Sequence, residues 1–468
     1  MTSALISNGD SLHFPARVRL SDQETALLHK AQAVLNDHWL GHATQPAPQL
    51  YPYQWSWDSG FIAMGYAHYD QERAMQELRS LFQGQWKNGL LPHIVFHNWD
   101  ENGRAYCPGP DDWQVERSPY APRHVPTSGI IQPPIHATAA LHIYRHARDQ
   151  KRAYDFLIEL FPQLVAWHHY LYRERNLEQD GLIYIRHPWE SGQDNSPLWD
   201  SLMQRMLLAP HRMPASTHGH TRLVRKDARS QDDDLYLYLL NRAGDCAYDE
   251  ALIQRDCPFL VQDVLFNALL VKANQDLAAI ATLLGFDAKP FDRWAQQTAR
   301  SINIKLWNPF EGFYMSYDLV AEAQIPVCVA SNFTPLYAQI PNPEQASEMV
   351  SHLFSSAFQG NSLGKWAVPS CSRQEMGFSA YLYWRGPIWM NLNWLLYHGL
   401  FANGFVAEAH HLRQLTLRLF NRSGFCEYFH PDSGEGLGTP NYSWSAALAI
   451  DLILGSPSLG ASGSNDPM

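Results

Sequence analysis

Two short segments, far apart in the chain, combine carboxylates with aromatic residues and glycine. Residues 189–197 are Trp-Glu-Ser-Gly-Gln-Asp-Asn-Ser-Pro, and residues 427–436 are Glu-Tyr-Phe-His-Pro-Asp-Ser-Gly-Glu-Gly. Hydrolysis of a glycosidic bond uses two carboxyl groups: one donates a proton to the leaving oxygen, and the other, ionised, activates water. Neighbouring aromatic rings exclude water, which raises the pKa of an acid, and they offer a flat apolar face to a sugar. The segments therefore indicate acid–base hydrolysis of a carbohydrate, although polar loop residues that cap helices would give a similar pattern.

Each of these segments offers two candidates for its catalytic role. In the first, Asp194 follows a glycine, where the backbone can turn toward a ligand, and Glu190 adjoins Trp189. Either carboxylate could be the general acid, because spacing alone does not decide between them. In the second, Glu427 and Glu435 are both candidates for the general base.

A third aromatic cluster precedes an apolar stretch. Residues 51–60 read Tyr-Pro-Tyr-Gln-Trp-Ser-Trp-Asp-Ser-Gly. Asp58 could cap the N-terminus of the helix that follows. It could also accept hydrogen bonds from two sugar hydroxyls while Trp55 or Trp57 stacks on the ring. The two roles are compatible with each other.

A fourth cluster, residues 383–389, places a charge at the start of an apolar helix. Its sequence is Tyr-Trp-Arg-Gly-Pro-Ile-Trp. A charged group such as Arg385 is buried only when it is paired. Arg385 could hold a catalytic carboxylate in its ionised form, or it could close a salt bridge in the core, which is the commoner case.

The composition excludes several classes of function. The formal net charge is -11 and no basic run stands out, so nucleic acid is not an expected partner. No apolar run reaches the roughly 18 residues of a membrane span, and residues 1–20 lack the pattern of a secretory signal. Aromatic residues make up 13% of the chain, with 16 Trp and 22 Tyr, more than core packing explains. Exposed rings of this kind suit the apolar faces of sugars.

The cysteine and histidine patterns suggest no metal or redox chemistry. The 6 cysteines are dispersed without a Cys-x-x-Cys pair, which is typical of reduced cysteines in a cytosolic protein. His136, His168 and His169 do not form a His-Glu-x-x-His motif, and the acidic residues 232–234 lack calcium-loop spacing. We expect a cytoplasmic protein without metal or organic cofactor.

Helical periodicity dominates the chain, and apolar residues recur with the spacing of one buried helix face. The expected helices are 22–40, 70–86, 135–148, 153–173, 233–242, 261–284, 291–307, 344–354, 387–401, 406–420 and 442–454. Together with less certain helices near Phe61 and Ser331, we expect about twelve helices, which follow one another in neighbouring pairs. Short hairpin strands are expected at 91–96, 182–186 and 312–317. Strands and helices do not alternate, so we predict an all-α protein built as a ring of helix hairpins, the (α/α)6 barrel.

The predicted organisation is one catalytic domain. Residues 21–455 form this domain, between an N-terminal extension, 1–20, and a disordered tail, 456–468. The longest irregular stretches are 98–134 and 191–230, and we interpret both as lid loops because long loops in compact domains are usually functional covers.

Taken together, the motifs resemble glycoside hydrolase family 63. The segments 189–197, 383–389 and 427–436, with the closing Tyr-Ser-Trp-Ser-Ala-Ala at 442–447, carry the resemblance, which spans residues 51–454. It is closest to the bacterial hydrolases of mannosylglycerate and glucosylglycerate. Leu198 stands where many other members carry arginine, which favours this small-substrate branch.

The resemblance implies an inverting mechanism, with Asp194 as general acid and Glu427 as general base. It also implies a small sugar substrate, and we expect the binding site to include Tyr51, Trp55, Asp58, Gln132, Trp189, Glu190, Tyr236, Tyr383, Trp384, Arg385, Trp389 and Asn441. No arginine is evident for a glycerate carboxylate, which leaves the aglycone open. The alternatives are a trehalase-like α-glucosidase of a neutral disaccharide or glucosylglycerol, and a sugar-binding protein without catalysis. Assembly as a homo-oligomer stays open.

Overall fold

The computed structural model describes residues 20–97, 99, 106, 108–208, 231–360 and 365–455. Within these ranges the chain is predominantly helical, and its strands are two residues long. The predicted all-α class is therefore confirmed. The predicted tail lies outside the described residues, and so does the predicted N-terminal extension except for Leu20.

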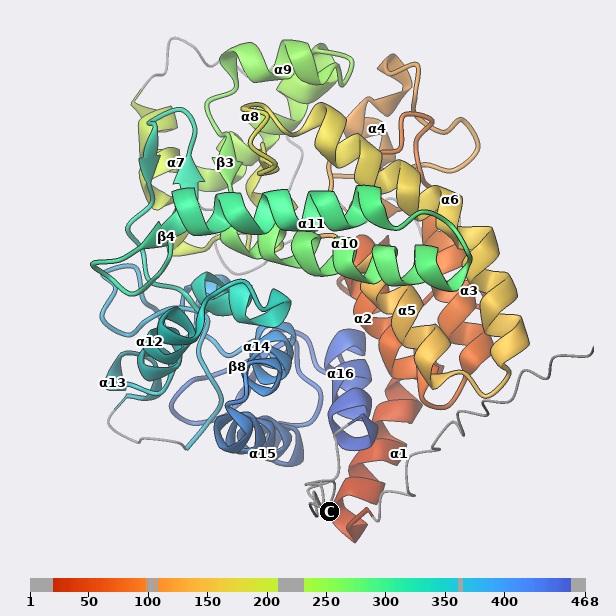
Figure 1. Ribbon diagram of the computed structural model, residues 1–468, viewed down its shortest axis with the longest axis vertical. Helices are drawn as coiled ribbons and strands as arrows, with labels where there is room; N and C mark the ends of the chain where they lie inside the picture. The colour runs from red at the N-terminus through yellow and green to blue at the C-terminus, as the bar shows by residue number, and fades with distance from the viewer. Residues whose placement is uncertain are drawn as a thin grey trace, which may run out of the picture.

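Six helical elements bury most of their residues and contact one another in a closed cycle, called the inner ring below. They are α2 (Ser56–Ala67), α5 (His136–His146), α10 (Val264–Leu283), the 3-10 helix η6 (Ala330–Ala338), α14 (Met390–Ala402) and α16 (Ser443–Leu454), and Figure 1 labels all of them except η6. Each element contacts the next, and α16 contacts α2, so the contacts close on themselves. In α2, for example, every residue is buried. A helix that is apolar on all sides needs neighbours on all sides.

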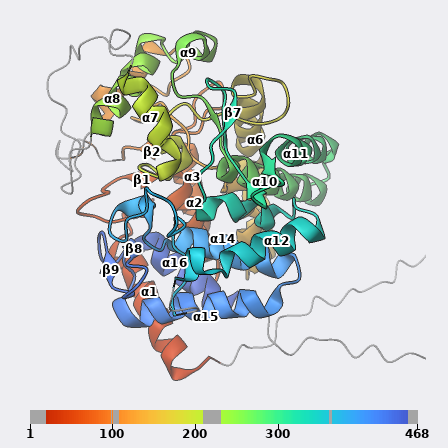
Figure 2. The ribbon, with the colours of Figure 1, turned by 90° about the vertical axis from the view of Figure 1, so that its left-hand side faces the viewer.

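Outer helices alternate with the inner elements along the chain, and each packs on one of them. They are α1 (Asp22–Asp37), α3 (Gln71–Phe82), α6 (Gln150–Glu174), α11 (Lys289–Ser301), α12 (Pro343–Leu353) and α15 (Val406–Ser423). In Figure 2, α11 and α15 lie at the rim of the molecule and α14 lies nearer its middle. The outer helices are amphipathic: α3 buries Ala74, Leu78 and Leu81, spaced about one turn apart.

Sequence signals set the starts of several helices. Ser21 and Glu24 form a capping box before α1, and the Asp70 side chain accepts a hydrogen bond from the Arg73 backbone N–H before α3. Asp149 and Asp263 cap α6 and α10 in the same way. These caps satisfy backbone donors that a helix leaves unpaired at its first turn.

Helix α10 is long and apolar enough to cross a membrane, but 83% of its most apolar window is buried inside the protein. It is an inner-ring helix in contact with α5, α11 and η6. Its hydrophobicity is therefore explained by the neighbours that surround it.

Short antiparallel pairs connect the helices. Strand β1 (Gln54–Trp55) pairs with β2 (Ile94–Val95), and β8 (Tyr428–Phe429) pairs with β9 (Gly436–Leu437). The other strands are β3 (Val261–Gln262), β6 (Tyr317–Asp318) and β7 (Ala323–Gln324) in one sheet, and β4 (Trp307–Asn308) with β5 (Phe313–Tyr314).

The remaining short elements lie in the connections. They are α4 (Pro110–Trp113), η1 (Val115–Arg117), η2 (Pro188–Ser191), η3 (Pro197–Trp199), α7 (Asp200–Leu207), α8 (Gln231–Asp245), α9 (Glu250–Asp256), η5 (Ile302–Leu306), α13 (Ser356–Gln359) and η7 (Tyr383–Arg385). The two predicted lid loops contain α4, η1, η3 and α7, and parts of both loops lie outside the described residues.

Two features of the connections differ from the sequence prediction. The predicted strand at 182–186 is absent, because only Ile185 bridges to Val261 while Ile183 hydrogen-bonds through its N–H to the Asn267 side chain. The short helices α4, α7, α9 and α13 were not predicted, because their four to eight residues are too few to show a periodicity.

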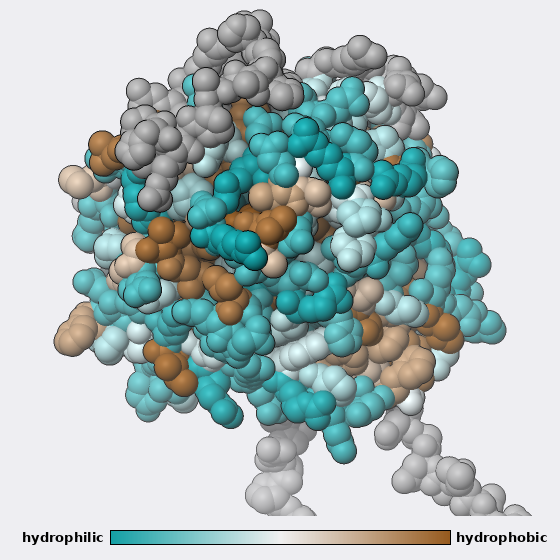
Figure 3. Space-filling view, turned by 90° about the horizontal axis from the view of Figure 1, so that it is seen from above, coloured by the Kyte–Doolittle hydropathy of each residue, from teal (hydrophilic) through white to brown (hydrophobic). Residues whose placement is uncertain are grey.

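On the face seen in Figure 3, apolar side chains of the coloured residues form small patches among hydrophilic ones. Exposed apolar residues of this scattered kind are normal for a protein surface. All 16 tryptophans lie in the described ranges, and each of them is buried or half-buried.

Candidate active site

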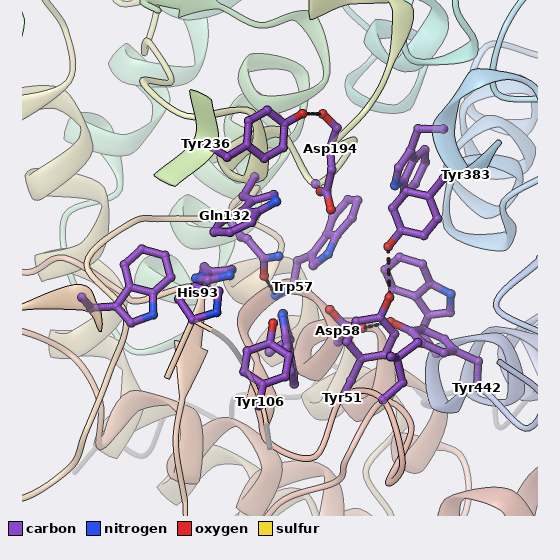
Figure 4. Close-up of a pocket in the computed structure, with 18 residues that line it drawn as sticks. Tyr51, Trp57, Asp58, His93, Tyr106, Gln132, Asp194, Tyr236, Tyr383 and Tyr442 are labelled. Atoms are coloured by element: carbon purple, nitrogen blue, oxygen red, sulfur yellow. Dashed lines mark hydrogen bonds between the residues drawn. The ribbon is translucent and has the colours of Figure 1, made fainter. Parts of the chain in front are cut away.

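A pocket opens at the N-terminal ends of the inner helices α2 and α16 and beside the segments that precede α5 and α14 (Figure 4). It encloses about 920 Å³, part of which is open to solvent. Its described lining is Leu50, Tyr51, Trp55, Trp57, Asp58, His93, Tyr106, Pro108, Trp113, Gln132, Trp189, Gly192, Asp194, Tyr236, Tyr383, Trp384, Tyr442 and Trp444. This concentration of aromatic rings accounts for part of the aromatic surplus.

Asp58 lies in the first turn of α2 and points into the pocket. It is buried, and its Oδ1 accepts a hydrogen bond of 3.0 Å from the Tyr442 hydroxyl. Burial raises the pKa of Asp58 to about 7; the Tyr442 hydrogen bond opposes the rise and the nearby Glu427 charge adds to it. Asp58 can therefore change its protonation state near neutral pH.

Asp194 points into the pocket from the side opposite Asp58 (Figure 4). The preceding turn requires Gly192, which has φ +70° and on which a Cβ would lie 2.4 Å from the Trp57 ring. The Tyr236 hydroxyl donates to the Asp194 backbone carbonyl. The next residue, Asn195, accepts a 3.0 Å hydrogen bond from the backbone N–H of Trp384. Contacts from distant parts of the chain thus fix this loop.

Glu427 lies directly behind the pocket wall rather than in the lining. Its Oε1 accepts a 2.9 Å hydrogen bond from the hydroxyl of Tyr51, which does line the pocket, and its Oε2 accepts a 3.2 Å bond from the Thr439 backbone N–H. The β8–β9 hairpin holds it, and Gly438 leaves the needed space, since a Cβ there would lie 2.5 Å from Oε2. A buried carboxylate is therefore one hydrogen bond away from the pocket.

Glu435, the other carboxylate considered for the base, is exposed and does not line the pocket. It lies at the turn of the same hairpin, where its backbone carbonyl accepts a 2.8 Å hydrogen bond from the His430 N–H. The geometry of the hairpin therefore favours Glu427 over Glu435.

The neutral part of the lining surrounds the two aspartates. Gln132 is buried, and its Oε1 accepts a 3.2 Å hydrogen bond from the Trp57 backbone N–H. The hydroxyls of Tyr51 and Tyr383 lie 3.3 Å apart. His93 is buried beside Trp189, and burial keeps the pKa of His93 well below its usual value, with the nearby His187 lowering it further. A neutral imidazole and several hydroxyls suit the hydroxyl groups of a sugar.

Three of the predicted binding residues lie outside the lining. The Arg385 guanidinium pairs with Asp200 at 2.7 and 2.6 Å, so it forms a structural ion pair beside the Asp194 loop. Trp389 is buried and stacks on Trp384 with ring centroids 3.8 Å apart, which supports the pocket wall from behind. Asn441 is exposed, with a φ of +56°.

Glu190, the fourth residue outside the lining, is fully buried in an ion pair. Nη1 and Nη2 of Arg175 donate to its carboxylate at 3.0 and 2.9 Å, and the backbone N–H groups of Arg186 and Ile131 donate at 2.7 and 3.3 Å. Burial alone would raise the pKa of Glu190, but the two arginine charges and these hydrogen bonds lower it. An ionised Glu190 cannot donate a proton, so the geometry favours Asp194 as the candidate acid of this segment.

Replacing Glu190 by Gln should destabilise the fold by roughly 3–5 kcal/mol, because Arg175 would be left buried without its partner charge. The pKa of Glu190 is lowered from 4.5 in the folded protein, so its contribution is present above about pH 4.5 and is lost as the pH falls through the folded value. Chemical denaturation of the unmutated protein and of the Glu190→Gln variant, each at pH 7 and at pH 4, measures the difference between their free energies of unfolding. The exposed Glu435→Gln variant is the control, and equal stability of the Glu190 variant at pH 7 would contradict the assignment.

Several lining residues were not predicted as site residues from the sequence. They are Leu50, His93, Tyr106, Pro108, Trp113, Gly192, Tyr442 and Trp444. Tyr442 and Trp444 belong to a motif that was recognised, so their neighbours in sequence could have indicated them, and Trp57 was one of the two tryptophans considered for stacking on the sugar. His93 belongs to none of the recognised motifs. It reaches the pocket because the neighbouring strand β2 pairs with β1.

The described lining contains aspartates, a glutamine, a histidine, tyrosines and tryptophans, but no lysine or arginine. Such a site can hydrogen-bond sugar hydroxyls, stack on sugar rings and supply acid and base groups. It can protonate a leaving oxygen through Asp194 and activate water through a carboxylate on the opposite side.

Comparison with known proteins agrees with this chemistry. Residues 51–445 match the family model of the mannosylglycerate hydrolase MGH1-like glycoside hydrolase domain. The chain is 46% identical to a mannosylglycerate hydrolase of Rubrobacter radiotolerans over 94% of this chain and 98% of the relative. It is 34% identical to a glucosylglycerate hydrolase of Mycolicibacterium hassiacum, over 92% and 98% of the two chains.

Solved structures agree as well. The crystal structure of the GH63 mannosylglycerate hydrolase from Thermus thermophilus in complex with Tris and D-glycerate superposes with a TM-score of 0.82, at 40% identity, covering 91% of this chain and 99% of that one. The resemblance inferred from the motifs is therefore confirmed. The chain belongs to the MGH1-like glycoside hydrolases of family 63.

Proposed function

We propose that this enzyme hydrolyses mannosylglycerate or glucosylglycerate to the hexose and glycerate, with inversion at the anomeric carbon. The observation that carries the proposal is the pocket in which Asp194 and Asp58 face each other, with Glu427 one hydrogen bond behind Tyr51. The near full-length relatives that act on these two glycosides support the choice of substrate.

In the proposed mechanism Asp194 protonates the glycosidic oxygen, and Glu427 removes a proton from water on the opposite face of the sugar ring. An inverting enzyme needs its two carboxyl groups about 6.5–9.5 Å apart, so that water fits between Glu427 and the sugar. Asp58, paired with Tyr442, accepts hydrogen bonds from sugar hydroxyls. Trp57, Trp189 and Trp384 flank the ring and exclude water.

We also propose that residues 21–455 form one (α/α)6 barrel domain with lid loops over the pocket. The closed cycle of contacts among the inner elements and the alternation with outer helices support this arrangement. A cytoplasmic location is consistent with the five described cysteines, all of which are free.

A hydrolysis panel tests the proposed function. The purified protein is incubated with mannosylglycerate, glucosylglycerate, glucosylglycerol and trehalose, and released hexose is followed by proton NMR. We expect release from one or both glycerate glycosides, with the β-anomer appearing first. Release of the α-anomer first would contradict inversion, and release from none of the glycosides would contradict the proposed activity.

The panel also tests a second candidate, an enzyme for a neutral glycoside. The absence of lysine and arginine from the described lining favours this alternative, since a glycerate carboxylate is commonly bound by a cation. Faster release from trehalose or glucosylglycerol than from either glycerate glycoside would establish it.

A further inference from the structure

Three inner helices bring histidines together at the ends opposite the pocket, and a fourth brings an aspartate. His68 is the C-cap of α2, and His146 is the last residue of α5, one turn after His142. Asp451 lies in the final turn of α16, and His398 lies toward the end of α14. Pocket residues come from the N-terminal ends of α2 and α16. A 12-residue helix spans about 18 Å, so the two clusters are separated by the length of the ring.

The three imidazoles of His68, His142 and His146 lie close together. Each offers a ring nitrogen, and these atoms all lie within 4.8 Å of one another. The His142 and His146 ring centroids are 4.0 Å apart, and those of His68 and His146 are 4.5 Å apart. Nitrogens bound to one tetrahedral zinc ion at ~2.0–2.1 Å are themselves roughly 3.3 Å apart, so small side-chain rotations would complete the site.

The hydrogen bonds of the cluster leave ring nitrogens for a ligand. His146 Nδ1 is used by the His142 backbone carbonyl at 2.9 Å, which leaves His146 Nε2. His68 Nε2 lies 2.8 Å from Asp451 Oδ1, which leaves His68 Nδ1. His142 Nε2 is buried and has no aligned hydrogen-bond partner among the described residues, although Asp451 Oδ1 lies 3.3 Å away. A carboxylate that orients a histidine is a common companion of metal-bound imidazole.

Asp451 is a buried carboxylate whose described partners include no lysine or arginine. Its contacts are His68, His142, His398 and the Trp394 indole N–H, which donates at 2.7 Å. A buried carboxylate without such a partner is costly. The negative ends of the α2 and α5 dipoles also meet at this point, and they favour a cation.

We infer that His68, His142 and His146 form a binding site for one divalent transition-metal ion of the zinc class, with Asp451 orienting the His68 ring through its other nitrogen. Imidazole ligands suit Zn²⁺ better than Mg²⁺ or Ca²⁺, which prefer oxygen. The ion would join the C-terminal ends of α2 and α5 and stabilise the closed ring. It would take no part in hydrolysis, because the pocket lies at the opposite ends of these helices.

Zinc binding is measured on a tag-free chain that has been treated with a chelator and dialysed. Titration calorimetry should give one Zn²⁺ per chain, and the melting temperature should rise by about 3 °C when Zn²⁺ exceeds its Kd ~100-fold. The His146→Gln variant removes a partly exposed ligand. Because even outer-shell partners of metal ligands contribute ~10–100-fold to affinity, this variant should bind Zn²⁺ at least ~10-fold more weakly.

The exposed His29→Gln variant is the matched control and should bind Zn²⁺ like the unmutated protein. Removal of the metal should change hydrolytic activity less than about 2-fold, and so should the His146→Gln substitution. Activity is measured at a temperature at which the metal-free protein and the variant are both folded. Equal Zn²⁺ binding by both variants, or no stoichiometric binding by the unmutated chain, would overturn the inference.

A second measurement does not depend on the folding of a variant. Co²⁺ bound to three imidazoles in a four-coordinate site gives strong visible absorption, which Zn²⁺ should abolish by competition. If Co²⁺ gives only the weak absorption of the hydrated ion, the cluster holds no metal and the inference is overturned.

Discussion

Replacing Asp194 by Asn should lower the hydrolysis of the glycerate glycoside by roughly 10²- to 10⁴-fold, the usual contribution of a positioned general acid. The same variant should recover much of its rate on the corresponding α-glycosyl fluoride, because fluoride leaves without being protonated. Rates on both substrates, measured side by side, give the result. Folding should be unaffected, since the contacts that fix the loop use the Asp194 backbone carbonyl and the Asn195 side chain.

The Glu427→Gln variant should hydrolyse the glycerate glycoside more slowly by a similar factor. Its rate should not recover on the glycosyl fluoride, because the attacking water would still lack a general base. The exposed Glu435→Gln variant, in the same hairpin, is the matched control and should keep near-normal rates on both substrates. Recovery of the Glu427 variant on the fluoride, or near-normal turnover of either the Asp194 or the Glu427 variant, would refute the assignment of roles.

Replacing Asp58 by Asn should lower kcat/KM roughly 10- to 100-fold through the loss of charged hydrogen bonds to the sugar. In contrast to the Asp194 variant, it should not recover on the glycosyl fluoride. Recovery would mean that Asp58, whose pKa is raised to about 7, is the general acid in place of Asp194.

The same Asp58→Asn substitution should stabilise the protein at high pH. The folded pKa of about 7 lies above the ordinary 3.8, so the folded state holds the Asp58 proton more tightly than the unfolded state. Asp58 therefore makes stability fall as the pH rises from about 4 to 7, by at most roughly 4 kcal/mol at 1.36 kcal/mol per pKa unit. The amide oxygen of Asn can still accept the Tyr442 hydroxyl.

Melting temperatures of both proteins at pH 5 and pH 8 measure this effect. The variant should melt at a higher temperature than the unmutated enzyme at pH 8, and the difference should shrink at pH 5. A lower melting temperature at pH 8 would show that ionised Asp58 is stabilised in the free enzyme. The predicted result would place the enzyme among proteins that give up stability for an active-site carboxylate.

The helices could be predicted from sequence because their signals are local. Residues 22–40 and 70–86 were predicted to be helical, and the observed helices are Asp22–Asp37 and Gln71–Phe82, which begin at the caps Ser21 and Asp70. Apolar periodicity and a capping residue act within a few turns, so they can be recognised without knowledge of the tertiary structure. The 3-10 helix Ala330–Ala338 was only a weak signal, because Pro335 interrupts it.

The pocket could be predicted only in part. Motif positions indicated Tyr51, Asp58, Asp194 and Trp384, all of which line it. The same motifs also contain Glu190, and its partner Arg175 lies 15 residues earlier, beyond any motif. Adjacency in sequence therefore did not distinguish a lining carboxylate from a buried structural one.

The sequence by itself determined the helices and the loops that carry the chemistry, because caps, periodicity and glycine turns are short-range properties of the chain. The tertiary structure alone decided which of those side chains meet. It placed Glu427 behind Tyr51, paired Glu190 with Arg175 and gathered His68 and His142 around Asp451. The physical reason is that burial and charge pairing depend on residues brought together by ring closure, and no local pattern records those partners.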